Sequence, residues 1–433
     1  MPKNIVTVKG ASVSQTVSAT DSRSAGELRE AMTDTLVAGG WVTSAEVERA
    51  FRTVPRHEFV PPGTSLADAY HADFAPIAKS APDGTHLSSV SAAWLQARMI
   101  AQAGIAPGMR VLEIGSGGYN AALLAEVTGK EGQVVTIDID PDITARAAAA
   151  LAATGYGDRV TVVTGDGEAG VPEHGPYDAI VVTAGAWDLP RAWTSEQLTP
   201  DGRLVVPLRL STLSRSIGFR RRDGHLVSES WEMCGFVPFQ GAGAHAEPSV
   251  TLPGPAGGHV SLRFDQDIPA DAGLLAGALA TEQAMHWSGV TIGHQVSFAD
   301  LNLWLAAFLP GFCRVAASEG TELHAEGQNK AWFPFGGVTG DSFACLALRK
   351  LDGTGVARYE FGAKAYGPHA TEAAVALIAE VRKWDAAGRD LVQEAFAFWP
   401  ADIELPLSPP VTAIFPKAHG AITAHWPPVV RSA

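Results

Sequence analysis

The sequence predicts an α/β fold in which a mostly parallel sheet, with helices on both faces, is followed by a second, α+β region. Three observations carry this prediction. Residues 110–125 read as a short buried strand, a glycine-rich turn and a helix. Further apolar strand segments then alternate with helical ones, as in folds built from parallel strands. Residues 217–221 and 226–231 flank Asp223-Gly224, a hairpin signal, so the last strand should run antiparallel.

The other elements of this first half follow in a consistent order. Residues 1–24 lack periodicity and are expected to be a mobile arm. Two amphipathic helices are expected within 26–52, and residues 63–93 carry clustered hydroxyl groups that are compatible with a surface loop. The remaining expected elements are a helix from 94 to about 104, strands at 110–114, 134–138, 160–163, 177–182 and 203–206, and helices beginning at 120 and spanning 143–153 and 191–198.

The glycine-rich turn has the composition of a ligand-binding loop. Gly115, Gly117 and Gly118 remove Cβ atoms where the backbone turns tightly and where a ligand can approach. Asn120 is expected to cap the following helix, whose first N–H groups would favour a carboxylate or a phosphate. The alternative is a plain strand-to-helix turn, because many α/β folds contain one.

Two acidic residues at strand ends favour a nucleoside-like ligand. Asp138 ends the second strand, where a carboxylate can accept hydrogen bonds from ribose hydroxyls. Asp166 lies between Gly165 and Gly167 after the next strand, where it can accept a hydrogen bond from an amine such as that of adenine, or stabilise a simple turn. No phosphate-binding lysine follows the glycine-rich turn, which argues against a Walker-type nucleotide site. A nucleoside-like ligand with an amino-acid tail fits better, and S-adenosylmethionine is the expected ligand.

Composition limits the classes of partner. The chain has 433 residues, enough for two or three domains, and 46% are hydrophobic. The formal net charge of −14 argues against nucleic acid or an anionic membrane as the main partner. Cys234, Cys313 and Cys345 are widely spaced and odd in number, which favours reduced structural thiols. No membrane-spanning run or cleavable signal is visible, so the protein is expected to be cytoplasmic.

The second half of the chain is expected to form a domain of its own. We place the first domain at 25–242, a linker rich in Gly, Ala and Pro at 243–258, and a compact α+β domain at 259–433. The expected elements of the second domain are strands at 260–264, 343–349 and 357–363 and an amphipathic helix at 370–384.

Aromatic and histidine residues of the second half suggest a binding surface but no metal. The candidates for lining a peptide groove are His286, Trp287, Trp332 and Trp426. Packing of these rings in a core is the alternative. The spacing of His286, His294 and His324 is not that of metal ligands, so no metal is expected.

Several separated segments of the first half form one ordered pattern, from about Gly26 to Gly241. They are Val-Pro-Arg-His-Glu-Phe-Val at 54–60, Ser-Val-Ser-Ala-Ala-Trp-Leu-Gln-Ala-Arg-Met at 89–99, Gly-Asp-Gly at 165–167, Pro-Tyr-Asp-Ala-Ile-Val-Val-Thr-Ala at 176–184, Gln-Leu at 197–198, Gly-Arg-Leu-Val-Val-Pro at 202–207 and Phe-Val-Pro-Phe at 236–239. This pattern resembles the protein-L-isoaspartate (D-aspartate) O-methyltransferase family. The resemblance implies the class I, Rossmann-like fold of S-adenosylmethionine-dependent methyltransferases and the coproduct S-adenosylhomocysteine.

The resemblance also implies roles for individual residues. The cofactor-binding set is Glu113, Gly115, Ser116, Gly117, Gly118, Asn120, Asp138, Asp166 and Gly167. Within it, the glycines would hold the methionine end, Asp138 the ribose, and Asp166 with Gly167 the adenine, while Glu113 would support the loop from beneath. Ser91 matches the family's hydroxyl residue beside the substrate carboxylate, and the neighbouring Ser88 and Ser89 would help to bind the substrate.

Three departures from the usual family pattern indicate a particular branch of the family. The glycine loop is one residue shorter, Ala93 replaces a proline, and the chain continues for about 190 residues beyond the last matching segment. These features resemble the FxLD-type branch, whose members accompany lanthipeptides. That branch implies methylation of an aspartate side chain in a modified precursor peptide, leading through a succinimide to isoaspartate, with residues 259–433 recognising the peptide.

The chemistry that the resemblance implies needs positioning more than acid–base catalysis. A carboxylate is already ionised at neutral pH, because its reference pKa is roughly 4. Ser91 would therefore orient the acceptor oxygen, while the site aligns the reacting atoms and excludes water. Two other interpretations stay open: a general repair methyltransferase acting on damaged isoaspartate, and a cofactor-binding scaffold without activity.

Overall fold

The computed structural model describes residues 22–115, 117–327, 335–351, 356–405 and 411–426. The α-helices are α1 (Ala25–Ala38), α2 (Ala45–Thr53), α3 (Leu66–Ala69), α4 (Ala93–Ala103), α5 (Tyr119–Thr128), α6 (Pro141–Ala153), α7 (Ala299–Phe308), α8 (Glu322–Gly327) and α9 (Ala370–Ala386). The strands of the first half are β1 (Ile77–Ser80), β2 (His86–Ser89), β3 (Arg110–Ile114), β4 (Gln133–Asp138), β5 (Val160–Thr164), β6 (Tyr177–Val182), β7 (Leu198–Leu210), β8 (Leu213–Arg222) and β9 (His225–Met233). Those of the second half are β10 (Ser249–Pro253), β11 (His259–Arg263), β12 (Ala284–Gly293), β13 (Phe312–Ala317), β14 (Phe335–Thr339), β15 (Ser342–Leu351), β16 (Arg358–Tyr366), β17 (Phe396–Pro400), β18 (Val411–Lys417) and β19 (Gly420–Trp426).

The larger sheet has ten strands and confirms the predicted parallel core. Its order is β18-β19-β17-β9-β8-β7-β6-β3-β4-β5. Strands β3 to β7 pair in parallel, whereas β8 and β9 continue the sheet antiparallel. At the β8–β9 turn both Asp223 (φ 48°) and Gly224 (φ 84°) adopt the positive φ of a type I′ hairpin turn, as the sequence predicts.

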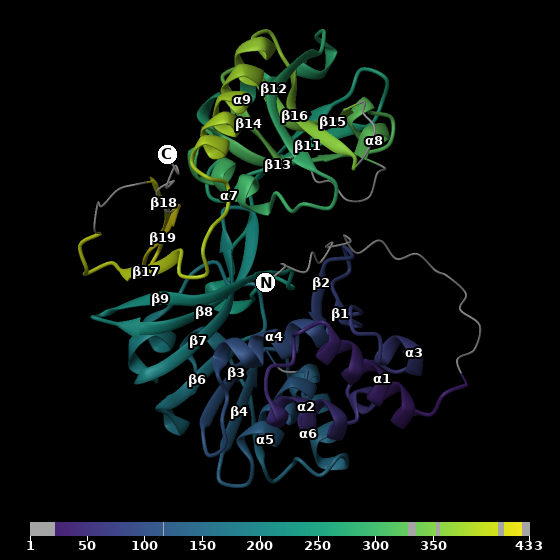
Figure 1. Cartoon of the computed structure of the whole chain (residues 1–433), viewed down its shortest axis with the longest axis vertical. Helices are drawn as coiled ribbons and strands as arrows, with labels where there is room; N and C mark the ends of the chain where they lie inside the picture. Colours follow the sequence, from purple (N-terminus) through teal and green to yellow (C-terminus); the bar gives the residue numbers. More distant parts are fainter. Residues whose placement is uncertain (1–21, 116, 328–334, 352–355, 406–410, 427–433) are drawn as a thin grey trace.

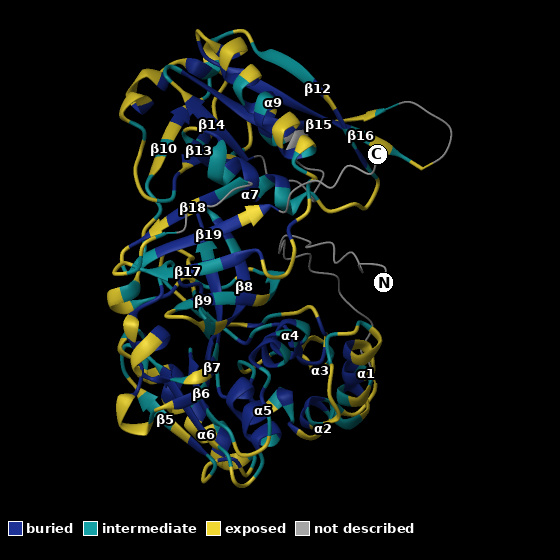
Figure 2. Cartoon of the chain, turned by 60° about the vertical axis from the view of Figure 1, so that its left-hand side comes forward, coloured by how far each residue is buried: buried dark blue, intermediate teal, exposed yellow. Residues whose placement is uncertain are grey.

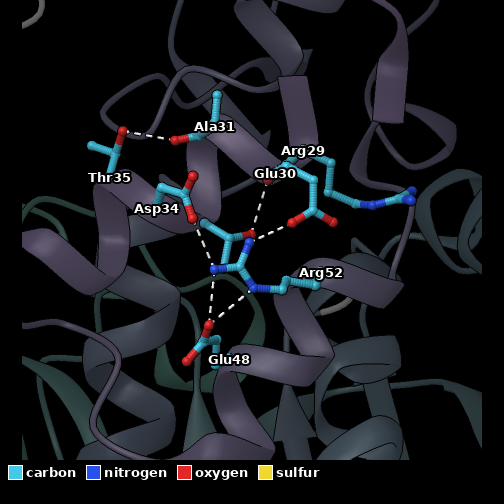
Figure 3. A network of polar contacts seen from close by, with 8 residues as sticks. Arg29, Glu30, Ala31, Asp34, Thr35, Glu48 and Arg52 are labelled. Carbon is cyan, nitrogen blue, oxygen red and sulfur yellow. Dashed lines mark hydrogen bonds and ion pairs between the residues drawn. The ribbon is translucent and has the colours of Figure 1, made fainter. Parts of the chain in front are cut away.

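Helices cover one face of this parallel core. Apolar residues of α1, α2, α4 and α5 form one buried cluster with Val111, Ala179 and Val205 of the sheet. Figure 2 shows α5 dark blue over most of its length, in contrast to the yellow outer side of α1. The two N-terminal helices, which the sequence predicts, are joined by Arg52 of α2, which donates to Asp34 of α1 and to Glu48, each at 2.8 Å, and also contacts Glu30 (Figure 3).

The opposite face lacks one of the expected helices. The helix predicted at 191–198 is only a single π-helical turn, Ala192–Glu196. The side chain of Gln197 bonds to the backbone of Val171 and Ala169, and Leu198 already pairs with Tyr177. These tertiary contacts draw the chain into β7, so the local helical pattern is overridden and short turns cover this face instead.

The second half forms a seven-stranded antiparallel sheet that the sequence predicts only in part. Its order is β10-β11-β13-β14-β15-β16-β12, and α9 packs on β12, β15 and β16 (Figure 1). The strands expected at 260–264, 343–349 and 357–363 and the helix at 370–384 are confirmed as β11, β15, β16 and α9. By contrast, β10 lies within the stretch that is expected to be a linker.

The chain returns to the first sheet at its end. Strands β17, β18 and β19 complete the ten-stranded sheet, because β17 pairs with β9, and Figure 1 shows them next to β9. One buried apolar cluster therefore runs through both halves, from Leu208 and Ile217 of the larger sheet to Trp304 of α7 and Leu377 of α9. The sheet thus combines strands from both sides of the expected boundary at 258.

The aromatic candidates of the second half divide between core and surface. Trp426 is fully buried and packs edge-to-face on Trp304, with 5.0 Å between ring centroids, which is the core alternative. Trp287 is half-buried, and Arg349 lies over its ring at 4.3 Å. His286 is also half-buried, and Trp332 lies outside the described residues.

No helix in the described part of the chain is long and apolar enough to cross a membrane. Nor do three or more His, Cys, Asp or Glu residues gather there as a metal site would require.

Candidate functional site

A pocket at the carboxyl ends of β3 and β4 gathers most of the predicted site residues. It encloses about 720 Å³, part of it open to solvent. The predicted residues that line it are Ser88, Ser89, Ser91, Glu113, Gly115, Gly117, Asn120, Asp138 and Gly167. Gly118 and Asp166 do not line it, and Ser116 lies outside the described residues. Ligands of open α/β sheets bind at this edge.

The glycine-rich turn is held against the end of β6. Gly115 has φ 101°, and a Cβ atom there would lie 2.6 Å from Thr183 Oγ1, so a larger residue would displace the turn. The Thr183 hydroxyl is within hydrogen-bond distance of two carbonyl oxygens, those of Gly115 at 2.7 Å and Ile114 at 3.1 Å. This close approach fixes the turn from beneath and leaves its other side open to the pocket.

Asn120 does not cap α5, which corrects the sequence prediction. The helix begins one residue earlier, at Tyr119, and its cap position is Gly118 with φ 83° and no side-chain hydrogen bond. Gly118 is needed for this conformation, and a Cβ atom there would lie 3.0 Å from the ring of Phe59. Asn120 instead lines the pocket, with its buried Nδ2 lacking any hydrogen-bond partner among the described residues.

Glu113 is a buried acid at the base of the pocket. Its side chain is about 1% exposed, and Thr136 donates a hydrogen bond of 2.6 Å to its Oε2. Desolvation is the main effect and raises the pKa of Glu113 from 4.5 to about 7, although the hydrogen bond from Thr136 favours the ionised form. The nearby Asp138 raises this pKa further, so Glu113 can exchange a proton near neutral pH.

The two predicted aspartates differ in their surroundings. Asp138 lines the pocket, and its Oδ1 accepts the N–H of Asp140 at 2.9 Å. Asp166 accepts two backbone N–H groups, from Glu168 at 3.0 Å and from Ala242 at 2.7 Å. Asp166 therefore fixes the segment after β9 beside the pocket, and any contact with adenine would use the remaining lone pairs of its oxygens.

Hydroxyl residues form another part of the pocket lining, here called the serine wall. Ser88 and Ser89 belong to β2, Ser91 follows it, and all three residues are half-buried. No described residue forms a hydrogen bond with the Ser91 hydroxyl, which leaves it available to a substrate. Gln240, which also lines the pocket, donates from Nε2 to the carbonyl of Leu87 at 3.2 Å and so ties its segment to this wall.

A lysine connects the serine wall to the part of the pocket formed by Glu113, Asp138 and the glycine-rich turn, here called the cofactor wall. Lys79 of β1 pairs with Asp140 at 2.5 Å and with Asp142 at 2.9 Å. Because β1 pairs with β2 and Asp140 donates to Asp138, the ion pair connects the serine wall to the carboxylate expected to bind ribose.

Replacing Lys79 by methionine is therefore expected to weaken cofactor binding modestly. A partly exposed ion pair contributes little, so calorimetry should show S-adenosylhomocysteine binding about two- to fivefold more weakly at low salt, with the difference vanishing at high salt. Lys383→Met, which removes an ion pair with Glu380 on α9, is the control and should leave binding unchanged. Equal salt sensitivity of Lys79→Met and the unmodified protein would contradict the expectation.

Several pocket residues were not predicted from the sequence. Those with polar or aromatic side chains near the glycine-rich turn include Gln96, Thr183, Phe239 and Gln240. Thr183 carries a usable signal, since it is a hydroxyl residue at the end of a buried strand, where ligand sites of such sheets lie. Phe239 and Gln240 come from a segment far along the chain, and no local pattern places them over the glycine-rich turn.

The pocket fits S-adenosylmethionine in its polar groups. The unpartnered Asn120 amide and the acidic Glu113 suit the polar methionine end, and Asp138 suits ribose hydroxyls. At Gly117 a Cβ atom would meet only a Val90 methyl, at 3.9 Å, so its backbone is open to a ligand.

The first half of the chain is similar to proteins of one known family. Residues 27–243 match the family model described as protein-L-isoaspartate(D-aspartate) O-methyltransferase. The protein-L-isoaspartate O-methyltransferase of Hyperthermus butylicus is 38% identical over 224 residues, which cover 50% of this chain and 89% of that protein. Protein-L-isoaspartate O-methyltransferase 2 of Archaeoglobus fulgidus is 39% identical over 199 residues, covering 46% and 86%. A solved protein-L-isoaspartate O-methyltransferase aligns over 86% of this chain and 95% of its own, with a TM-score of 0.47 and 24% identity.

The family match includes the glycine-rich turn, the serine wall and the segment that covers them. The class I methyltransferase fold expected from the sequence is confirmed, with a large additional β-rich region beyond the match. The chain belongs to the protein-L-isoaspartate (D-aspartate) O-methyltransferase family and is an S-adenosylmethionine-dependent carboxyl O-methyltransferase.

Proposed function

We propose that this enzyme methylates the free carboxylate of L-isoaspartyl residues in peptides or proteins. The observation that carries the proposal is that Ser88, Ser89 and Ser91 line the same pocket as Glu113 and the glycine-rich turn. An acceptor carboxylate bound by the serines would lie directly beside the cofactor wall. The names of the relatives, all protein-L-isoaspartate O-methyltransferases, support the same substrate class.

The side chains of the pocket would act by binding and orientation. When bound, S-adenosylmethionine supplies a methyl group on a positively charged sulfur. The Ser91 hydroxyl would donate a hydrogen bond to one oxygen of the acceptor carboxylate and so turn the other oxygen toward the methyl group. Phe239 and Gln240, which cover the pocket, would limit the access of water. No general base is needed, because the acceptor is already an anion.

The product ester explains what methylation would achieve. An ester carbonyl is more electrophilic than a carboxylate, so the backbone nitrogen of the next residue can attack it. The new C–N bond closes a succinimide, and methanol leaves with the amide proton. Hydrolysis of the succinimide then gives aspartate or isoaspartate, which makes the step suitable for repair.

A second candidate is a tailoring enzyme that methylates one programmed aspartate in a ribosomally made, lanthipeptide-like precursor. The seven-stranded sheet favours it, because this sheet lies beyond residue 243, where the family match ends. The sheet packs continuously against the catalytic half through α7 and the returning strands β17–β19. A large region fixed to the enzyme in this way would suit recognition of a particular folded or ringed peptide.

Mass spectrometry of parallel reactions separates the two candidates. The acceptors are an isoaspartyl peptide, the same peptide with aspartate, and a lanthionine-ringed peptide that contains aspartate. Gain of one methyl group by the isoaspartyl peptide alone is the expected result. Methylation of the ringed aspartyl peptide alone would overturn the proposal in favour of the second candidate. Without methylation of any of the three acceptors, the proposed carboxyl transfer would be wrong.

A further inference from the structure

A fully buried arginine lies behind the serine wall. Arg56 follows α2 and has no exposed surface. Its guanidinium donates to the carbonyl of Ala69 (Nε, 2.8 Å), to Gln96 Oε1 (Nη1, 2.8 Å), and to the carbonyls of Ser91 (Nη2, 2.8 Å) and Phe74 (Nη2, 3.3 Å). These four acceptors belong to separate segments, so a single side chain ties together the surroundings of Ser91.

Burial of the Arg56 charge costs more free energy than burial of an apolar side chain of similar volume would. A buried charge is normally paired with an opposite charge, because desolvation of an unpaired ion is expensive. Arg56 forms no ion pair with a described carboxylate, and the acceptors around it are neutral, with the Tyr119 ring 4.8 Å from its guanidinium carbon. An apolar side chain could fill the volume, but only a guanidinium offers a planar fork of donors to several carbonyls at once.

The guanidinium group of Arg56 contacts residues of both walls of the pocket. Ser91, Gln96 and Tyr119 all line the pocket, and Tyr119 is the first residue of α5, directly after the glycine-rich turn. Arg56 holds Ser91 by its backbone carbonyl, which leaves the Ser91 hydroxyl free to face the substrate. A shift of this backbone would move the hydroxyl relative to the cofactor wall.

We propose that Arg56 is a positioning residue of the methyl-acceptor site, which fixes the Ser91 hydroxyl at the place that in-line transfer requires. Its effect on turnover rests on the proposed function, whereas its effect on the backbone of residues 86–91 does not. Arg56 touches no substrate in this scheme and acts through Ser91 and Gln96.

The test compares Arg56→Lys with Arg215→Lys. Lysine keeps the positive charge but lacks the planar set of N–H donors that contacts several carbonyls at once. Arg215 is a matched control, since it is also buried, donates to the carbonyls of Ser214 and Ala299, and lies over the Trp231 ring, away from the pocket. Each variant is assayed for kcat and acceptor KM with an isoaspartyl peptide, for S-adenosylhomocysteine affinity, for melting temperature and for amide hydrogen exchange at residues 86–91.

We expect both variants to melt at lower temperature, but only Arg56→Lys to change the site. Its kcat should fall about 10- to 100-fold with cofactor affinity altered less than about threefold, because a small misplacement of a positioning group mainly affects the reacting geometry. Exchange at residues 86–91 should accelerate in Arg56→Lys and stay unchanged in Arg215→Lys. Unchanged kcat and exchange in a folded Arg56→Lys protein, or equal losses in both variants, would overturn the inference.

Two outcomes need a separate measurement. If the unmodified enzyme does not methylate the isoaspartyl peptide, the proposed function fails, and hydrogen exchange still decides the role of Arg56. If Arg56→Lys does not fold, Gln96→Met replaces it, because this change removes one acceptor of the fork. Faster exchange at residues 86–91 in Gln96→Met supports the inference, and unchanged exchange refutes it.

Discussion

Replacing Ser91 by alanine is expected to lower kcat about 100-fold while S-adenosylhomocysteine affinity stays nearly constant, because the hydroxyl acts on the acceptor and not on the cofactor. Ser91 lines the same pocket as Glu113, its hydroxyl has no partner among the described residues, and its carbonyl is bound by Arg56. Without the hydroxyl the carboxylate keeps its charge but loses its fixed orientation. Steady-state kinetics with an isoaspartyl peptide measure the first effect, and calorimetry measures the second.

Ser80→Ala provides the matched control for this change. Ser80 lies on β1 of the same hairpin, but its hydroxyl bonds to His86 and does not line the pocket. Its removal should leave both kcat and cofactor affinity unchanged. If Ser91→Ala turns over as fast as the unmodified enzyme, Ser91 has no part in the mechanism. Positioning of the Ser91 hydroxyl by Arg56 would then have no effect on turnover.

The parts of the fold that depend on local pattern were predicted well. The strand–turn–helix at residues 110–125 and the turn at Asp223-Gly224 are set by apolar runs and by glycine over a few residues, and both are confirmed. The clustering of Ser88, Ser89 and Ser91 with the glycine-rich turn was expected only through the family resemblance. Periodicity alone is also compatible with a surface loop there, because hydroxyl residues favour both.

Features that depend on tertiary contacts were missed. The return of β17–β19 to the first sheet pairs Ala397 with Val227, and no signal in either segment encodes that pairing. The helix expected at 191–198 is cut short by the side chain of Gln197, which bonds to distant backbone. The full burial of Arg56 also has no signal in the sequence, because arginine is rarely buried without a carboxylate.

Replacing Glu113 by glutamine is expected to stabilise the protein above neutral pH. The pKa of Glu113 is raised from 4.5 to about 7, chiefly by desolvation, so the folded state binds the proton more tightly than the unfolded state does. Stability therefore falls as pH rises from about 4.5 to 7, and above pH 7 the cost of burying the charge reaches at most about 3 kcal/mol. Glutamine can still accept the Thr136 hydrogen bond but carries no charge. Urea unfolding should show a clearly larger gain at pH 8 than at pH 5.

Glu360→Gln should behave in the opposite way. Although burial alone would raise its pKa, hydrogen bonds from Arg349 and the Gly289 N–H lower the pKa of Glu360 below its usual value. Its ionised form therefore stabilises the fold, and this contribution is lost only as the pH falls below 4.5. Glu360→Gln should therefore destabilise the protein by a similar amount at pH 8 and pH 5, and by less at more acid pH. The same change in stability at pH 5 and pH 8 for Glu113→Gln would show that Glu113 does not titrate in this range.

Cofactor binding should be coupled to the same proton. A bound S-adenosylmethionine carries positive charge on its sulfur and its amino group, and either charge near Glu113 favours the ionised carboxylate. Binding would then release a proton below pH 7, and affinity would increase by up to about tenfold per pH unit until the free enzyme is itself ionised. Calorimetry in two buffers of different ionisation enthalpy measures the released proton directly. Glu113→Gln should release none and bind with an affinity independent of pH between 5 and 8. Equal proton release by both proteins would place the titrating group elsewhere and leave Glu113 with only its structural contact to Thr136.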